Sequence, residues 1–435
     1  MAFLVFIPLP LGSNRDASMA FLVAWVGLIA LVWASGWLFN LRFWQWRRVH
    51  RVGLVLAGLL LLFQAWVGLQ LAAGWTLDSY ATFKYLMLGL AYSVLFVVVL
   101  DVFKTRQRLV WLIAALLVSG TLQALLGTMR AFGELSGLFG WLFESSRQVA
   151  TGTFVNRNHF AGYLEMTLAL GIGLMLAFRT GRDWSWVGFL ELLLSPKMMI
   201  RLALILMVIA LVMTQSRMGN TAFMVSLLVV SVLFIARNPL NRVRNGLIIL
   251  SILLIDVLII SQYFGLERLK DRVFSTEVSV TVDQGNLIVN LDDLRGLAFE
   301  RGLPLAMEKP WVGQGAGTYE LAFMPYSGID FGGHFDHAHN DFLQFWIEFG
   351  LIGSLLLLAF LALSFYFALK ALWMRESLFR SGLGFGVTMA LLSITIHSFF
   401  DFNLQIPANA ATFVVVCALA VLAPYHSHEP KSSVR

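Results

Sequence analysis

Long apolar runs alternate with short polar segments from one end of the chain to the other. A transmembrane helix needs about 20 mostly apolar residues, and by that measure the sequence predicts about twelve spans. These are Ala2–Leu11, Met19–Phe39, Val52–Ala73, Tyr85–Phe103, Leu109–Met129, Phe160–Phe178, Met198–Thr214, Thr221–Ala236, Gly246–Phe264, Phe342–Leu372, Leu383–Phe400 and Ala408–Ala423. The first is short and contains two prolines. The pattern is typical of an all-α polytopic membrane protein.

The segment Gly265–Asn340 is the largest polar interruption of this pattern. Valines alternate with polar residues before Asp283–Asn286, which favours a small β-hairpin. An amphipathic helix is expected over Arg295–Lys309, because Pro310 would stop it. Glycines at alternate positions follow over Gly313–Gly317, and we interpret them as permitting a tight turn rather than as a ligand site.

These boundaries divide the chain into four parts. Residues 1–264 would carry the first nine spans, and residues 265–340 would form a loop outside the membrane that carries the chemistry. Residues 341–424 would carry the last three spans, and residues 425–435 a polar tail.

Composition and charge add a topology to this map. Hydrophobic residues make up 59% of the chain and charged residues 13%, against about 25% charged in soluble domains. When the short loops are assigned alternately to the two sides, 19 Lys and Arg residues fall on one side and six on the other. The positive-inside rule then places both termini in the cytoplasm. The net charge of +6 reflects this topology and does not indicate a nucleic-acid partner.

The densest candidate chemistry lies just before the tenth span, where His334, His337 and His339 stand close to Asp336 and Asp341. Three interpretations are open. The cluster offers enough ligands for a metal, although the single cysteine, Cys417, excludes a cysteine-based zinc site. His339 is also suited to be a general base, since the positive end of a helix dipole favours neutral imidazole. A hydrated loop without a function is the third interpretation.

Several other polar residues are candidates. Arg217 in a turn between two spans, Arg157 and Arg295 are expected in one layer, where guanidinium groups would bind an anion such as phosphate. Ordinary snorkelling of each arginine is the alternative. Carboxylates inside predicted spans are Glu165, Asp256 and Glu348, and His397 and Asp401 are spaced i,i+4 near a helix end. Buried carboxylates of this kind also fit a proton-coupled anion transporter, which should have an internal repeat that the sequence lacks.

A longer pattern resembles a known family. His339-Asn340 followed by nine residues and then Gly350 and Gly353 resembles the His-[Asn/Ser/Gln]-x9-Gly-x-x-Gly signature of O-antigen ligases. Arg295 at its distance before Pro310, Arg217 after Ser216, and the late His397 and Asp401 agree with that family. The resemblance spans roughly Asn156 to Ala423. O-antigen polymerases and bacterial protein O-oligosaccharyltransferases share the signature.

The resemblance implies a membrane glycosyltransferase in the bacterial inner membrane. Its substrates would be an O-antigen carried on undecaprenyl diphosphate and a lipid A–core acceptor, which meet at the periplasmic face among membrane lipids. The reaction would be a single inverting displacement without a metal or another cofactor.

In this mechanism His339 would be the general base, and Arg217 and Arg295 would neutralise the leaving diphosphate. The remaining expected substrate-binding residues are Arg157, Asn158, His159, His337, Asn340 and Asp401. His334 and His337 lie so close to His339 that His337 is the alternative base.

Overall fold

The computed structural model describes residues 1–39, 48–132, 149–178, 196–237, 246, 250, 281–283, 286–288, 294–326, 335–374 and 376–426. Nine helices in this part of the chain are long and apolar enough to cross a membrane. They are α2 (Asp16–Leu38), α3 (Arg48–Ala72), α4 (Ser79–Val102), α5 (Arg106–Ala131), α7 (Arg157–Ala177), α10 (Arg217–Arg237), α15 (Asp341–Leu372), α16 (Leu378–Ser398) and α17 (Pro407–Tyr425). The all-α polytopic membrane fold is therefore confirmed.

These nine helices match nine of the predicted spans, and α9 (Pro196–Met213) matches a tenth. The predicted span Gly246–Phe264 lies outside the described residues apart from Gly246 and Leu250. The first predicted span is wrong. Helix α1 (Ala2–Phe6) has five residues, too few to cross a bilayer. A short 3₁₀ turn, η1 (Leu11–Ser13), leads on to α2.

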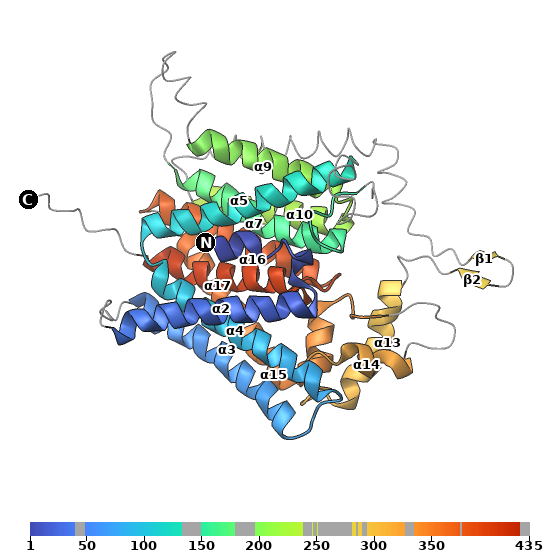
Figure 1. The fold of residues 1–435 in the computed structure, drawn as a ribbon. Coiled ribbons are helices and arrows are strands. Elements are labelled where there is room, and N and C mark those ends of the chain that lie inside the picture. Colours follow the sequence, from blue (N-terminus) through green and yellow to red (C-terminus); the bar gives the residue numbers. More distant parts are fainter. Residues whose placement is uncertain are drawn as a thin grey trace, which may run out of the picture.

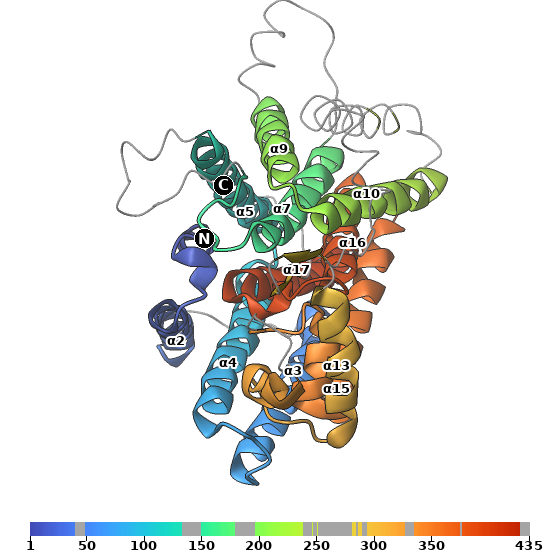
Figure 2. The same ribbon diagram turned by 90° about the vertical axis from the view of Figure 1, so that its right-hand side faces the viewer.

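Helix α7 lies at the centre of the bundle, between α5, α10 and α16 (Figures 1 and 2). Every residue from Asn158 to Ala177 is buried. Glycines allow its backbone to touch α16, because a Cβ atom on Gly173 would lie 2.6 Å from the backbone of Gly382 and Gly386. Small residues at such contacts let membrane helices approach closely, so α7 and α16 form a close-packed pair.

Helix α15 was predicted as one continuous span, but it is broken at Gly350. That residue has φ +64° and ψ −177°, a conformation that only glycine adopts readily. The loop after α13 (Leu294–Glu308) docks into the break, where Leu351 N donates to Pro310 O at 2.8 Å. A Cβ atom on Gly350 would lie 2.2 Å from Trp311 O, so glycine is required for docking as well as for the bend.

The elements outside the bundle are short. Helix α13 and helix α14 (Tyr319–Phe323) lie at one end of the bundle (Figure 1), and a 3₁₀ turn, η3 (Met324–Tyr326), follows them. Strands β1 (Thr281–Asp283) and β2 (Asn286–Ile288) form the hairpin, with Asp283 paired to Asn286. Gly313, Gly315 and Gly317 all have positive φ. They lie where the loop passes against other chain segments, so the turn interpretation of these glycines agrees with the structure.

Candidate functional site

The start of α15 brings His339 against Asp401, which follows α16. His339 Nδ1 lies 3.5 Å from Asp401 Oδ1, and the Asp401 side chain is fully buried. About a quarter of the His339 side chain is exposed, so one face of the ring is open. His339 has φ +49°, an uncommon conformation outside glycine that the surrounding structure has to hold. The arrangement suits an imidazole oriented at one nitrogen by a carboxylate.

Two residues at the start of α7 complete the surroundings of Asp401. Asn158 Nδ2 donates to Asp401 Oδ2 at 2.7 Å, and His159 Nε2 lies 3.7 Å from Asp401 Oδ1. Phe402 N donates to Asp401 Oδ1 at 2.9 Å. Asp401 therefore joins the beginnings of α7 and α15. Asn158, His159 and Asp401, which were predicted to bind substrate, contact one another here.

The three described histidines of the site surround the ring of Phe402. The centroid of the Phe402 ring lies 4.5 Å from the ring centroid of His159, 4.2 Å from that of His337 and 4.9 Å from that of His339. The His337 ring is stacked on Phe402. Sequence reasoning missed Phe402, although its position directly after Asp401 was a usable signal. The ring sets the spacing of the histidines by packing.

The Nδ1 atom of His337 contacts Gln344. This atom lies 3.1 Å from Gln344 Nε2 and 3.3 Å from Gln344 Oε1. Desolvation, and then the neighbouring His159, lowers the pKa of His337 to about 3, so this ring is neutral near pH 7. Asn340, which was expected to bind substrate, caps α15, because its Oδ1 accepts from Leu343 N at 3.0 Å.

Arg157 and Arg217 begin adjacent helices at the same end of the bundle. Arg157 is the first residue of α7, Arg217 is the first residue of α10, and both are exposed. A Cβ atom on Gly219 would lie 2.7 Å from Ala161 Cβ, so the first turns of the two helices touch. Arg217 thus lies at the level of α7 from which Asn158 and His159 reach Asp401.

Arg295 is the second residue of α13, and its side chain lies outside what the structure describes. The direction of α13 nevertheless locates its first turn. A Cβ atom on Gly302 would lie 3.0 Å from Leu343, and Pro310 is bonded to Leu351, so α13 and the first part of α15 run in the same direction. The first turn of α13 is therefore at the His339 end of α15.

The buried carboxylates have structural partners. Glu165 Oε1 and His397 Nδ1 are 2.8 Å apart, and both side chains are fully buried between α7 and α16. Helix α16 ends at Ser398, so His397 and Asp401 do not share a helical face as the i,i+4 spacing had suggested. Asp256, which the transporter hypothesis also used, lies outside the described residues.

No three His, Cys, Asp or Glu side chains converge as metal ligands in the part of the chain that the structure describes. His334, one of the ligands considered, is not among the described residues.

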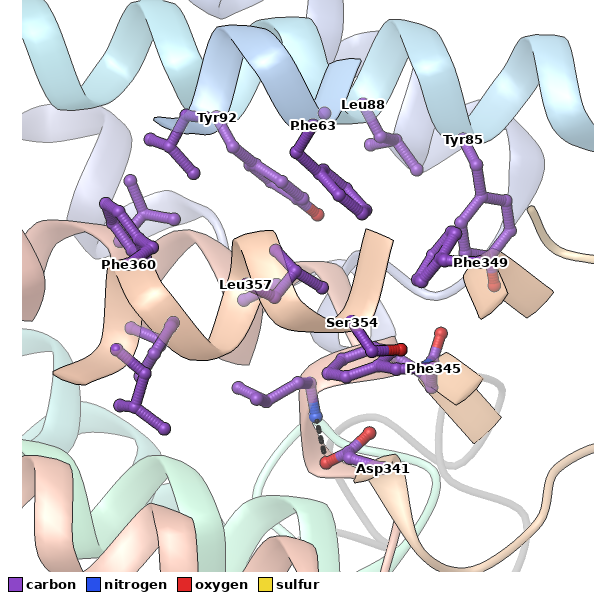
Figure 3. A pocket seen from close by; sticks show the side chains of 18 of the residues that line it. Phe63, Tyr85, Leu88, Tyr92, Asp341, Phe345, Phe349, Ser354, Leu357 and Phe360 are labelled. Carbon is purple, nitrogen blue, oxygen red and sulfur yellow. Dashed lines mark hydrogen bonds between the residues drawn. The ribbon is translucent and has the colours of Figure 1, made fainter. Parts of the chain in front are cut away.

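A cavity of about 190 Å³ lies between α3, α4, α15, α16 and α17 (Figure 3). Its walls are mostly aromatic and aliphatic, with Phe63, Phe345 and Leu357 among the side chains that point inward. Asp341 lines it and accepts through Oδ2 from Ser398 Oγ at 2.8 Å and Leu404 N at 3.0 Å. Since Asp341 is two residues after His339, the cavity begins next to the histidine site.

A comparison with known protein families gives a match for part of the chain. Residues 202–358 match the family model described as O-antigen ligase. This chain has an O-antigen ligase family domain. No curated protein matches the chain. The O-antigen ligase match includes Arg217, Arg295 and His339 and ends just beyond Gly353, whereas Asn158, His159 and Asp401 lie outside it. The match of this domain supports a membrane glycosyltransferase of the O-antigen ligase and polymerase type.

Proposed function

We propose that the chain transfers O-antigen polysaccharide from undecaprenyl diphosphate to the lipid A–core oligosaccharide at the periplasmic face of the bacterial inner membrane. The observation that carries this proposal is His339, partly exposed and held with Nδ1 near Asp401, in the domain that matches the O-antigen ligases. Arginines at the starts of neighbouring helices at the same end support an anionic, diphosphate-linked donor.

In the proposed reaction, His339 is the general base. The Asp401 carboxylate keeps a proton on Nδ1, which leaves the lone pair on Nε2 for the acceptor hydroxyl. The proton of the hydroxyl moves to Nε2 while the acceptor oxygen bonds to the anomeric carbon. The bond from that carbon to the diphosphate oxygen breaks in the same step, so the configuration inverts. His159 and Asn158 hold Asp401 in place.

The leaving undecaprenyl diphosphate is already stable as an anion and needs charge neutralisation more than a general acid. Arg217 and Arg295 are proposed for this role, and Arg157 for contacts to the donor beside them. Guanidinium groups bind phosphate oxygens in pairs, so arginines can replace the metal ion that many phosphate-binding enzymes use.

Reconstitution tests this function. The purified full chain in liposomes, given a lipid-linked O-antigen donor and lipid A–core acceptor, should produce a lipopolysaccharide ladder on a gel. We expect the same ladder in excess EDTA, because the proposed arginines neutralise the diphosphate in place of a metal ion. Loss of product on chelation, restored by Mg²⁺ or Zn²⁺, would instead support a metal site at the His334–Asp341 segment.

Other acceptors separate the related activities. A product formed only on a protein acceptor would identify a protein O-oligosaccharyltransferase, and elongation of the donor alone would identify a polymerase. Proton-driven uptake of a small anion without glycosyl transfer would identify a transporter.

The apolar cavity is proposed to hold part of the hydrocarbon chain of a lipid substrate. No Lys or Arg is among the described residues that line it, so a hydrocarbon fits it and a diphosphate does not. Leu357 points into it from α15 (Figure 3), whereas Leu355 on the same helix is 56% exposed and does not line it.

Filling this cavity should weaken binding of a lipid substrate. We expect Leu357→Trp to raise the KM for a lipid substrate about tenfold, roughly the effect of 1.4 kcal/mol, with little change in kcat. Leu355→Trp is the matched control and should behave like the unmodified chain. Unchanged KM values for both substrates in Leu357→Trp would show that the cavity holds neither chain.

A further inference from the structure

Glu348 is a fully buried carboxylate that the proposed mechanism does not use. It lies two residues before the break in α15 and accepts three hydrogen bonds. Gly317 N donates to Oε2 at 3.0 Å, and Tyr319 N donates to Oε1 at 3.3 Å. Gln344 Nε2 donates to Oε1 at 3.0 Å. A buried carboxylate is costly unless it is hydrogen-bonded, so these donors account for its presence.

Gly317 belongs to the loop that follows α13, and Tyr319 is the first residue of α14, directly after that loop. The same loop is tied to α15 by Gln314 N, which donates to Ile347 O at 2.8 Å, and by Gly315 N, which donates to Glu348 O at 3.0 Å. From α3, Gln70 Nε2 donates to Val312 O at 2.6 Å and to Glu348 O at 2.8 Å. Glu348 is thus one of the points where this loop is attached to the first part of α15.

Gln344 carries the connection on to the histidine segment. Backbone Ala338 N donates to Gln344 Oε1, so the amide nitrogen of Gln344 is the end that faces Glu348. The other hydrogen of that nitrogen then points at His337 Nδ1, 3.1 Å away. Gln344 Oε1 accepts from Ala338 N at 3.2 Å. Both bonds hold the two residues that directly precede His339.

We propose that Glu348 and Gln344 are positioning residues, which fix the His337–His339 segment relative to the loop that follows α13. Glu348 sets the orientation of the Gln344 amide, and Gln344 in turn holds His337 and the backbone of Ala338. These bonds to the two preceding residues help to maintain the unusual φ of His339. The inference rests on the proposed function, in which His339 must be aimed at an acceptor hydroxyl.

The expected loss follows from geometry. A displacement of about 1 Å at a reacting group can cost about 10²-fold in rate. Glu348→Gln has nearly the same shape but turns an NH₂ group toward backbone or side-chain donors, so at least one of the three bonds is lost. Gln344→Leu removes the link from the other side, and it serves as the second variant if Glu348→Gln does not fold.

The test has one readout that does not depend on transfer. Diethyl pyrocarbonate acylates the free nitrogen of neutral imidazole, and in His337 that nitrogen is Nδ1, which Gln344 occupies. Site-resolved mass spectrometry of the full chain in detergent should find that each variant raises labelling of His337 several-fold. In the reconstituted assay kcat should fall about 10²-fold, with the KM for the donor unchanged because the arginines are untouched.

Ser364→Ala is the matched control, since Ser364 is a buried polar residue of α15 beyond the break, and its described partners, Phe360 O and the Cys417 side chain, belong neither to the histidine segment nor to the loop that follows α13. It should change neither readout. The double variant Glu348→Gln/Gln344→Leu should lose no more rate than the worse single variant, since both substitutions act through the same series of hydrogen bonds. Unchanged labelling of His337 in both single variants overturns the inference. Changed labelling in a chain that transfers no glycan leaves the positioning role in place and overturns the proposed function.

Discussion

His339→Ala is expected to lower the rate of transfer by about 10²–10⁴-fold, the usual contribution of a general base. The variant should still insert in the membrane, because His339 is partly exposed and its ring lies at the edge of the Phe402 packing. Transfer rates in the reconstituted assay, at matched amounts of protein, measure the effect. His339 is preferred over His337 because its Nδ1 lies 3.5 Å from Asp401 Oδ1, whereas the Nδ1 of His337 contacts Gln344 instead.

His337→Ala is the matched comparison and should lose less. In the unmodified chain, the pKa of His337 near 3 keeps this side chain neutral from about pH 5.5 to 8.5. Any step of the pH–rate profile in that range therefore comes from another group. A nearly inactive His337→Ala beside an active His339→Ala would move the base by two residues. If both variants keep their rate, another group activates the hydroxyl, and the buried carboxylates would have to be tested next.

Arg217→Ala is expected to lower transfer by about 10²–10³-fold, the usual effect of removing one preorganised charge donor. Arg217 is the exposed first residue of α10, so its side chain is not part of the buried core and the fold should survive the substitution. Arg217→Lys should recover little, because an ammonium group cannot make the planar paired contact that guanidinium makes with phosphate. Arg295→Ala is expected to behave in the same way.

Arg201→Ala is the control for charge alone. Arg201 is an exposed arginine of α9, near the end of that helix away from the turn that leads to Arg217. Arg201→Ala should give the same lipopolysaccharide ladder as the unmodified chain. Nearly normal ladders from Arg217→Ala would remove this residue from the site, and an equal loss in Arg201→Ala would point to a general electrostatic effect instead.

The local chemistry of the sequence was enough to predict most of the spans. In lipid, each helix must satisfy its own backbone hydrogen bonds and present apolar side chains, so the evidence for each span lies within the span. Helix α13 and the hairpin at Asp283–Asn286 were predictable for the same reason, because both are determined by residues close together in the sequence. The prediction failed at Ala2–Leu11, where local apolarity did not separate a span from the five-residue α1.

Only the tertiary structure decided which residues meet. Asn158 and Asp401 are 243 positions apart and bond directly, because α7 and α16 pack closely enough to bring their ends together. The break at Gly350 lies inside a segment that was predicted as one continuous span, and it is stabilised by a loop from another part of the chain. The role of Glu348 likewise depends on donors that no sequence pattern indicates. Spans are set by neighbouring residues, whereas this site is set by contacts between distant ones.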